Sequence, residues 1–195
     1  MKLYLCRHGE TEMNQKGVYY GRIDCDLTAK GRAQAQNLAV ALAEISPDLV
    51  IDTPLKRARA TADLILGDRT VPRLTEPRFQ ELDFGAWEGK SYKELRGDAL
   101  YEEWCRDWQN VRPPGGESFR DLAERTAAGF RDLQTRGDER ILIVSHHAVL
   151  QILMTLLLEQ PFDCCWHYRF EQGRYSYFEI LDHYAVLKGH NLGDL

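Results

Sequence analysis

The sequence predicts an α/β fold, a three-layer α/β/α sandwich with a mostly parallel central sheet and a helical cap insertion. Two observations predict it. Short, continuously apolar runs such as residues 49–51 and 141–144 are typical of strands that are buried on both faces. Stretches of helical periodicity separate these runs, and the repeated order of strand, helix and strand favours parallel strands joined by right-handed crossovers.

Length and composition set the expected organisation. The 195 residues, 44% of them hydrophobic, can bury one sizeable core, so we expect a single domain over residues 1–195 with the cap insertion at about 91–116. No apolar run approaches the roughly 18 residues of a membrane-spanning helix, and the N-terminus enters a strand-like pattern without the features of a signal peptide. We therefore expect a cytoplasmic protein with no membrane partner, either a monomer or a homodimer.

Charge and cysteine usage exclude several classes of function. The formal net charge of −5 disfavours nucleic acid as a partner, and any positive charge for an anionic substrate must be gathered locally. The five cysteines have neither a C-x-x-C pair nor another metal-ligand spacing, and their odd number argues against a disulfide framework. We expect free thiols and no metal site built on cysteine.

The first predicted strand delivers an arginine and a histidine at its end. Residues 2–6, apolar from Leu3 onwards, indicate a buried strand, and Gly9 permits a sharp exit after Arg7 and His8. Loops at strand ends are where α/β sheets place ligands. Residues 11–28 lack periodicity, and we expect a loop that passes over this strand end.

Strands and helices then alternate. Strands are predicted at residues 49–51 and 71–74, and helices at 29–45 and from Thr53 to Gly67. Thr28 is the expected N-cap of the first helix. Pro54 suits the first turn of the second helix, and Gly67 is placed to end it.

The middle of the chain carries the predicted cap. Residues 79–90 are loop-like but contain large apolar side chains, which indicates an ordered loop. Ser91 and Glu94 form a capping-box pattern for a helix that runs towards Trp108. After the break at 113–116, a second capping box is predicted for a helix that contains Phe119, Leu122, Thr126, Phe130 and Leu133; its two residues are Ser118 and Asp121.

The last predicted strand also ends in histidines. Residues 141–144 lead into Ser145-His146-His147, and residues 148–158 are apolar nearly all round, as expected of a buried helix. Residues 165–170 and 175–181 alternate in polarity around a turn at Gln172-Gly173, which predicts a closing hairpin.

Four separated motifs stand out between residues 3 and 150. They are Arg7-His8-Gly9-Glu10-Thr11 with Asn14, Leu55-Lys56-Arg57-Ala58 followed by Thr61-Ala62, Glu81 ahead of Phe84-Gly85 and Trp87-Glu88-Gly89, and Val144-Ser145-His146. Together these motifs resemble the histidine phosphatase superfamily, which includes cofactor-dependent phosphoglycerate mutases and many small phosphatases. The resemblance implies a phosphate monoester as the small-molecule substrate.

The resemblance also implies catalytic roles for five residues. His8 is the expected nucleophile, and its ordinary pKa near roughly 6.5, lowered further by nearby arginines, keeps it neutral for attack on phosphorus. Arg7 and Arg57 are expected to bind phosphate, because a guanidinium matches phosphate oxygens bidentately and stays charged. His146 is expected to donate a hydrogen bond to the same phosphate. Glu81 is the expected general acid and then general base; arginines would lower its pKa and burial would raise it, and the sequence leaves the balance open.

Further site assignments follow from the same resemblance. The expected substrate-binding residues are Arg7, Asn14, Gly21, Arg57 and His146. Tyr20 stands where relatives often have a small hydroxyl residue, so it receives no phosphate contact. Because two arginines supply the positive charge, we expect no metal and no other cofactor.

Other residues receive ordinary structural roles. A structural or surface position is expected for the remaining histidines, which are His147, His167, His183 and His190. Arg59 is expected on a solvated helix face. Trp104 and Trp108 are expected to pack rather than to bind.

Competing phosphoryl-transfer patterns are excluded. Residues 24–28 fit the D-x-D-x-T pattern of aspartate-dependent phosphatases, but no apolar strand precedes them. Residues 85–91 are one residue short of a P-loop and include an obstructing Trp87. No cysteine is followed six positions later by an arginine, which excludes the cysteine-dependent phosphatase loop.

The segments outside the catalytic motifs bear on the substrate. Residues 104–108, 113–118 and 166–170 resemble the α-ribazole phosphatases of cobalamin nucleotide-loop assembly, which implies hydrolysis of α-ribazole 5′-phosphate. A broad small-molecule phosphatase or a phosphoglycerate mutase-type phosphotransferase is the alternative. A non-catalytic phosphate-binding regulatory protein is a third, of another class.

Overall fold

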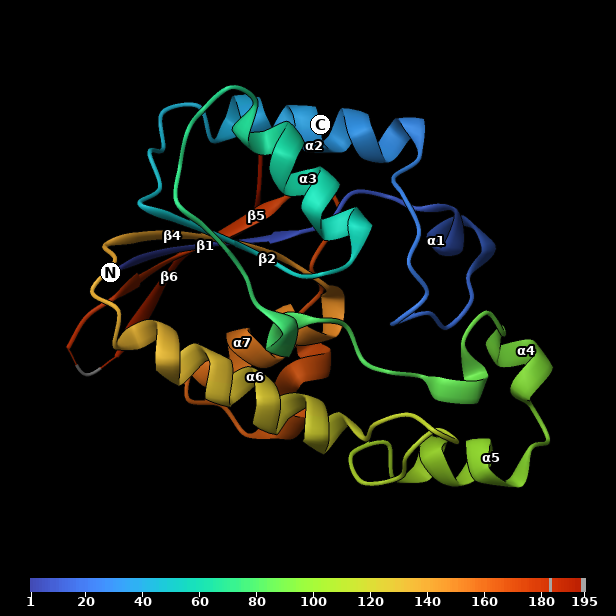
Figure 1. Cartoon of the computed structure of the whole chain (residues 1–195). Coiled ribbons are helices and arrows are strands. Elements are labelled where there is room, and N and C mark those ends of the chain that lie inside the picture. The colour runs from blue at the N-terminus through green and yellow to red at the C-terminus, as the bar shows by residue number, and fades with distance from the viewer. Residues whose placement is uncertain (183, 194–195) are drawn as a thin grey trace.

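A computed structural model of the chain describes residues 1–182 and 184–193. A six-stranded sheet lies between two layers of helices (Figure 1), as the sequence predicts. One face is covered by α2 (Ala29–Ala41) and α3 (Lys56–Leu66), and the other by α6 (Phe119–Gln134) and α7 (His147–Leu157). Within the described residues, no helix combines the length and the apolar character that crossing a membrane requires.

The sheet has the strand order β3-β2-β4-β1-β5-β6. Its strands are β1 (Lys2–Arg7), β2 (Leu49–Asp52), β3 (Arg73–Thr75), β4 (Arg140–Ser145), β5 (Tyr175–Ile180) and β6 (Ala185–Leu192). The first four strands pair in parallel, and β5 and β6 add an antiparallel edge. The sheet is therefore mixed and mostly parallel.

Continuous apolar runs form the central strands because both faces of the sheet are buried. Along β1, Leu3 and Leu5 belong to the core beneath α6 and α7, whereas Tyr4 and Cys6 belong to the core beneath α2 and α3. Side chains alternate between the two faces of a strand, so each face needs its own apolar set. This arrangement leaves the strand ends as the places for polar chemistry.

The N-cap predicted at Thr28 is confirmed, but the bounds of two predicted helices differ in the structure, and one predicted loop contains a helix. The Thr28 side chain accepts a hydrogen bond from Gly31 N at the start of α2, but the helix ends at Ala41 rather than at residue 45. Helix α3 begins at Lys56, so Pro54 precedes it. The loop predicted over residues 11–28 contains a short helix, α1 (Glu12–Lys16), which is too short to show periodicity.

The cap is a pair of short helices rather than one long helix. Both predicted capping boxes form, at Ser91 with Glu94 and at Ser118 with Asp121. The first starts α4 (Tyr92–Leu95), and the chain then breaks before α5 (Ala99–Arg106). Gly97 lies in this break with φ of 91°, a conformation that ends a helix and favours glycine.

The hairpin predicted between residues 165–170 and 175–181 is wrong. Residues 162–167 form a 3-10 helix, η3 (Phe162–His167), and the hairpin joins β5 to β6 instead. Strand β5 also pairs with β1, which supplies the non-local partner that alternation alone does not reveal.

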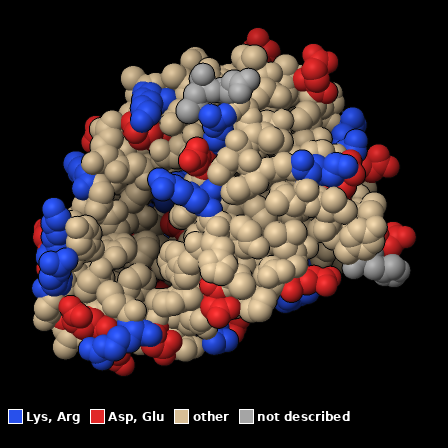
Figure 2. All heavy atoms as spheres, turned by 180° about the vertical axis from the view of Figure 1, so that it is seen from behind, with Lys and Arg blue, Asp and Glu red and all other residues tan. Residues whose placement is uncertain are grey.

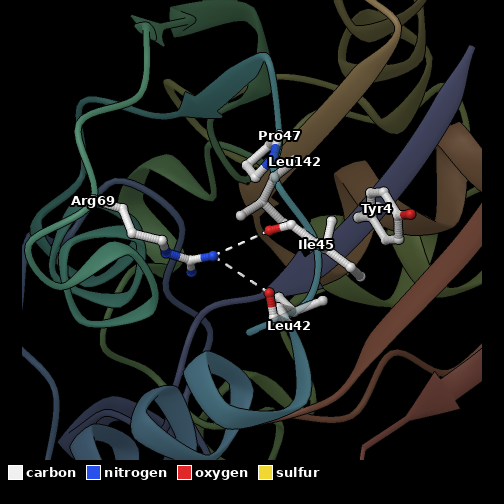
Figure 3. Close-up of a pocket in the computed structure, with 6 residues that line it drawn as sticks. All are labelled: Tyr4, Leu42, Ile45, Pro47, Arg69 and Leu142. Atoms are coloured by element: carbon white, nitrogen blue, oxygen red, sulfur yellow. Dashed lines mark hydrogen bonds between the residues drawn. The ribbon is translucent and has the colours of Figure 1, made fainter.

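Arg69 binds the backbone that follows the C-terminal end of α2 (Figure 3). This region lies away from the carboxyl ends of the parallel strands. Arg69 Nη1 donates to the carbonyl oxygens of Leu42 and Ile45, at 3.3 and 3.1 Å. The cavity beside it, which Tyr4 and Leu142 also line, has a volume of about 10 Å³. That is room for about one water molecule, so this region holds no substrate-sized pocket.

Candidate active site

Two neighbouring parallel strands bring the predicted histidines together. In the register of β1 and β4, Arg7 lies opposite Ser145, so His8 and His146 follow at the same edge of the sheet. The backbone N–H of His8 donates to the Ser145 carbonyl at 3.0 Å. The two imidazole ring centroids are 5.2 Å apart. One ligand of phosphate size can therefore contact both rings.

The His8 ring has one nitrogen engaged and one available. His8 is only 2% exposed, and its Nδ1 lies 2.8 Å from the Gly9 carbonyl oxygen. A carbonyl accepts only, so Nδ1 carries the proton and Nε2 keeps its lone pair. Burial and the charges of Arg57 and Arg7 hold the pKa of His8 well below its ordinary 6.5. The ring is therefore neutral and competent for nucleophilic attack.

His146 is the N-cap residue of α7 and is fully buried. Its Nε2 lies 2.9 Å from the Thr53 hydroxyl at the end of β2. Its Nδ1 is buried and has no hydrogen-bond partner in the described part of the chain. Burial, with Arg57 as the next cause, holds the pKa of His146 well below 6.5. The ring can thus present one polar atom to a ligand.

Arg57 is fully buried, and backbone carbonyls hold its outer nitrogens. Its Nη2 donates to the Gly21 carbonyl at 2.7 Å and its Nη1 to the Ile23 carbonyl at 2.9 Å. The guanidinium carbon lies 4.8 Å from the centre of the Tyr20 ring. Its buried Nε has no partner among the described residues. The loop thus orients the side chain, and the N–H of Nε stays available to a ligand.

Arg7 is held in the same way from the other side of the site. Its Nη1 donates to the Phe170 carbonyl at 2.9 Å, and its buried Nε is likewise without a partner in residues 1–182 and 184–193. Across that part of the chain, neither Arg7 nor Arg57 forms an ion pair. Buried cations without counter-ions are costly, so the site is built for an anion.

Glu81 lies at the N-terminus of α7. One carboxylate oxygen accepts from its neighbour Leu82 N at 3.0 Å, and the other is 3.4 Å from Ala148 N in the first turn of the helix. Arg125 Nη2 donates to the Glu81 backbone carbonyl at 3.1 Å, which fixes the segment that carries the carboxylate. Burial lowers the pKa of Arg7, and the nearby negative charge of Glu81 counteracts part of this lowering.

The two predicted accessory residues differ in what they can offer. The Asn14 side-chain oxygen accepts from Thr11 N at 3.0 Å and from Gln172 Nε2 at 2.6 Å, which leaves its amide nitrogen as the group for a substrate. The backbone N–H of Gly21 donates to Glu88, and its carbonyl accepts from Arg57. Both polar groups of Gly21 are therefore already paired within the protein.

Sequence reasoning left several residues of this neighbourhood without a role. The sequence placed Thr53 at a helix start and Gln172 in a turn but assigned neither to the site, because their partners His146 and Asn14 are distant in the chain. Tyr20 was set aside, yet its ring lies against Arg57 and its hydroxyl accepts from Thr11 at 3.0 Å. His147, expected to be structural, begins α7; burial and the charges of Arg7 and Arg169 lower its pKa to about 3.

The other expected roles are confirmed wherever the structure describes the residue. Arg59 and His167 are exposed, and His190 bonds through its ring to Ser176 and to the Arg169 carbonyl. His183 lies outside the described residues. All five cysteines are free, and the described residues contain no cluster of three or more metal-ligating side chains.

A hollow opens beside the buried residues. The face turned away from the viewer in Figure 1 is hollowed on the side of α4 and α5, and Lys and Arg side chains border the hollow (Figure 2). Next to Arg7 lies a pocket of about 380 Å³ whose other charged residues are Lys30, Arg169 and Glu171. Substrate can therefore approach Arg7 from a surface with a local excess of positive charge despite the negative net charge of the chain.

The cap contributes an aromatic cluster rather than charge. Trp87, Tyr101 and Trp104 pack with Leu95, and the hydroxyls of Tyr19 and Tyr101 lie 2.8 Å apart. The predicted packing role of Trp104 is confirmed.

Trp108 follows α5 and packs against another group of aromatic rings. It contacts Phe119 in α6 and, in η3, Phe162 and Trp166, with ring centroids 5.0 to 5.7 Å from its own. Trp108 therefore packs as predicted, and it joins the cap region to residues 162–167.

Comparison with known proteins adds a family and close relatives. A family model described as "Histidine phosphatase superfamily (branch 1)" matches residues 3–193. Proteins named adenosylcobalamin/alpha-ribazole phosphatase are similar over 191 residues: that of Escherichia coli (strain K12) is 39% identical and that of Salmonella typhimurium is 40% identical. These alignments cover 96% of this chain and 94% and 95% of the two relatives.

A solved structure has the same arrangement. The crystal structure of the alpha-ribazole phosphatase from Shigella flexneri superposes with a TM-score of 0.95 at 39% identity and covers 98% of this chain and 96% of that one. The likeness therefore extends over the cap as well as the sheet.

Proposed function

The chain belongs to the histidine phosphatase superfamily, and we propose that it hydrolyses α-ribazole 5′-phosphate to α-ribazole and inorganic phosphate. The names of the relatives, at 39–40% identity over nearly the whole chain, support this substrate. The proposed product serves cobalamin nucleotide-loop assembly, and the proposed location of the enzyme is the cytoplasm. We propose no nucleic-acid partner, metal or other cofactor.

One observation carries the proposed chemistry. Arg7 and Arg57 converge with two histidines, and each arginine keeps a buried Nε without a partner in the described structure. A phosphate dianion supplies the missing acceptor atoms and the missing negative charge at once. His8 Nε2 keeps its lone pair, because the proton of the ring is on Nδ1 beside the Gly9 carbonyl, and it can attack the phosphorus of the bound anion.

We propose that the first step transfers the phosphoryl group to His8. The Nε2 lone pair forms a bond to phosphorus while the bond from phosphorus to the ribose 5′-oxygen breaks. A proton from the Glu81 carboxyl group passes to that oxygen, and α-ribazole leaves. Arg7, Arg57 and His146 stabilise the negative charge of the transferring group by hydrogen bonds.

The second step reverses the role of Glu81. Its carboxylate takes a proton from water while the water oxygen attacks phosphorus. The bond between nitrogen and phosphorus breaks, its electron pair returns to His8, and inorganic phosphate is released. After this step His8 is free of phosphate and Glu81 is protonated again, so the enzyme is back in its starting state.

Accessory residues complete the proposed site. Asn14 contacts the phosphate through its side-chain amide nitrogen, because its oxygen is engaged by Thr11 and Gln172. Gly21 acts through Arg57, because its carbonyl accepts a hydrogen bond from Arg57 Nη2 and its own N–H already donates to Glu88. Residues 91–116, the proposed cap insertion, and residues 162–175 select the substrate around this common phosphate pocket.

Two other functions compete with this proposal. The phosphate pocket by itself suits a broad small-molecule phosphatase or a mutase-type phosphotransferase, because it contacts only the group that all such substrates share. A regulatory phosphate-binding protein needs no free nucleophile, so the available His8 Nε2 argues against it.

The test of the substrate is a panel of phosphate esters. The value of kcat/KM is measured for α-ribazole 5′-phosphate, 2- and 3-phosphoglycerate and phosphoserine, with mutase activity assayed on the phosphoglycerates. We expect α-ribazole 5′-phosphate to be preferred by at least about tenfold, which corresponds to about 1.4 kcal/mol of transition-state binding. A preference for phosphoserine or for a phosphoglycerate would overturn the substrate proposal and leave the phosphohistidine chemistry in place.

A further inference from the structure

We propose that Glu88 is a positioning residue that orients Arg57 towards the substrate phosphate through the loop of residues 21–23. The inference rests on the proposed function, because it gives Arg57 a phosphate to bind. It concerns a residue that touches neither the phosphate pocket nor the reacting atoms.

The Glu88 carboxylate collects backbone donors from two segments. Its Oε1 accepts from the N–H groups of Gly21 and Arg22, both at 2.8 Å, and its Oε2 accepts from Ile23 N at 2.9 Å. Oε1 also lies 3.3 Å from Phe84 N, at the start of the turn that carries Glu88. A carboxylate that accepts several backbone N–H groups holds them by charge-assisted bonds, which are stronger than neutral ones.

The peptide between Gly21 and Arg22 transmits this constraint to Arg57. Its N–H donates to Glu88 at 2.8 Å, and its carbonyl accepts from Arg57 Nη2 at 2.7 Å. The described chain has no cis peptide bond, and in a trans peptide the N–H and C=O point in opposite directions. Aiming the N–H at Glu88 therefore aims the carbonyl at Arg57.

The Arg22 side chain also anchors the loop, through Gln80, Asp83 and Glu117, but Glu88 is the side chain that binds the backbone N–H groups of residues 21–23. Residues 21–23 belong to no helix or strand. Gly21 is packed so closely that a Cβ atom there would lie 1.5 Å from the Leu82 carbonyl oxygen, so the backbone itself is the packing surface. Glu88 thus sets the orientation of the peptide groups, and the close contact with Leu82 sets their position.

The consequence for Arg57 follows from its lack of other partners. Two of its five N–H groups are held by the carbonyls of Gly21 and Ile23, which fixes the plane of the guanidinium, and its buried Nε has no partner among the described residues. If the carbonyls rotate, the plane of the guanidinium rotates with them, and Nε no longer faces the phosphate. Misplacement of a catalytic group by about 1 Å costs on the order of 100-fold in rate.

A double-mutant cycle separates positioning from general stabilisation. Glu88→Gln replaces one acceptor oxygen with an amide that cannot accept from the loop, and Arg57→Ala removes the group that is positioned. The value of kcat/KM for p-nitrophenyl phosphate and the melting temperature are measured for wild type, both single variants and the double variant. We expect Glu88→Gln to lower kcat/KM roughly 10- to 100-fold in wild type and less than twofold in the Arg57→Ala background.

Controls make every outcome decisive. Glu94→Gln alters a different glutamate that accepts a backbone N–H, that of Ser91 in the capping box of α4, and we expect it to leave kcat/KM unchanged in both backgrounds. If Glu88→Gln fails to fold, Glu88→Asp replaces it, because aspartate keeps the charge but has a shorter side chain. We expect the same difference between its effects in the wild-type and Arg57→Ala backgrounds. An equal loss in both backgrounds would overturn the positioning role. Unchanged activity of Arg57→Ala alone would instead contradict the proposed function of the site.

Discussion

The edge of the sheet carries polar side-chain atoms that lack partners within the described part of the chain, whereas the cap is formed mainly by packed aromatic side chains. At the ends of β1 and β4, the partly buried Arg7 and the buried His146 keep side-chain atoms without partners in the described structure. In the cap, Tyr101 and Trp104 stack on each other and meet Trp87 edge to face. The sheet edge thus leaves cationic and imidazole groups without partners, whereas the cap is held by contacts among its own aromatic rings, with Trp104 Nε1 as its unpaired polar atom among the described residues.

This difference indicates how the two regions contribute to function. Arg7 and Arg57 have no counter-ion in the described structure, so this edge of the sheet favours an anionic ligand, which we propose to be phosphate. Aromatic contacts are worth about 0.5–1.5 kcal/mol each and tolerate changes in shape, so the cap can be adapted to different leaving groups. Changes at the sheet edge should therefore alter the reaction itself, and changes near the cap should alter only the choice of substrate.

The largest effect is expected from removal of the nucleophile. His8→Ala leaves no nitrogen to accept the phosphoryl group, and we expect kcat to fall by at least about 10⁴-fold on every substrate, with the fold retained. Activity and circular dichroism measure the two parts of this prediction. His167→Ala is the matched control at an exposed histidine and should leave kcat unchanged on p-nitrophenyl phosphate, which lacks the leaving group that residues 162–175 are proposed to select. Residual turnover of His8→Ala within tenfold of wild type would rule out His8 as the nucleophile.

A smaller effect is expected in the dependence of stability on pH. The folded state keeps His147 neutral because burial, Arg7 and Arg169 lower its pKa to about 3, whereas the unfolded chain protonates it below its ordinary 6.5. Between these values the unfolded state binds more protons, so the free energy of unfolding falls as the pH falls. His147 alone should contribute a loss of about 1.4 kcal/mol between pH 7.5 and pH 5.5.

Urea denaturation of His147→Asn at the two pH values measures this contribution. We expect the variant to lose less stability on acidification than wild type by about 1.4 kcal/mol. Trp166→Ala, which removes no titrating group, should keep the wild-type difference. Equal losses in wild type and His147→Asn would contradict a neutral, buried His147.

A modest and selective effect is expected at the aromatic junction beside the cap. Trp166 is 50% exposed, its ring packs against Trp108 with centroids 5.1 Å apart, and it lies in the segment that we propose to select the leaving group. We expect Trp166→Ala to raise KM for α-ribazole 5′-phosphate about fivefold, equivalent to about 1 kcal/mol of stacking. The value of kcat/KM for glycerol 2-phosphate should change less than twofold. Equal losses on both substrates would assign Trp166 to general stability.

No effect is expected from chelation. Because Arg7 and Arg57 supply the positive charge, treatment with EDTA followed by gel filtration should leave kcat and KM within error of the untreated enzyme. Added Mg²⁺ or Zn²⁺ should not raise activity. A loss of activity that a divalent metal restores would show that the arginines are insufficient.

Local sequence signals predicted the parts of the fold that depend on neighbouring residues. The capping boxes at Ser91 and Ser118 and the N-cap at Thr28 form as expected, because each needs only side chains within one helical turn. The hairpin was misplaced because residues 165–170 alternate in polarity as β5 does. Pairing of β5 with β1, across about 170 residues of chain, distinguishes the two segments.

The candidate site divides in the same way. Arg7, His8 and His146 could be placed from the sequence, since buried parallel strands must end at one edge of the sheet. Thr53 and Tyr20 could not, because their contacts with His146 and Arg57 join segments that are far apart in the chain. Gly21 was expected to contact substrate, whereas the structure pairs both of its backbone groups with Glu88 and Arg57.

The sequence by itself determined the family, the order of the layers and the residue types that meet phosphate, because apolar patterns and motifs are carried by the covalent chain. Tertiary structure decided which atoms of those residues are free. The proton on His8 Nδ1 is held by a neighbouring carbonyl, while the aim of Arg57 depends on a loop more than 30 residues away and on Glu88. Burial, hydrogen-bond partners and lowered pKa values are properties of packed surroundings, and packing brings together segments whose proximity no local pattern encodes.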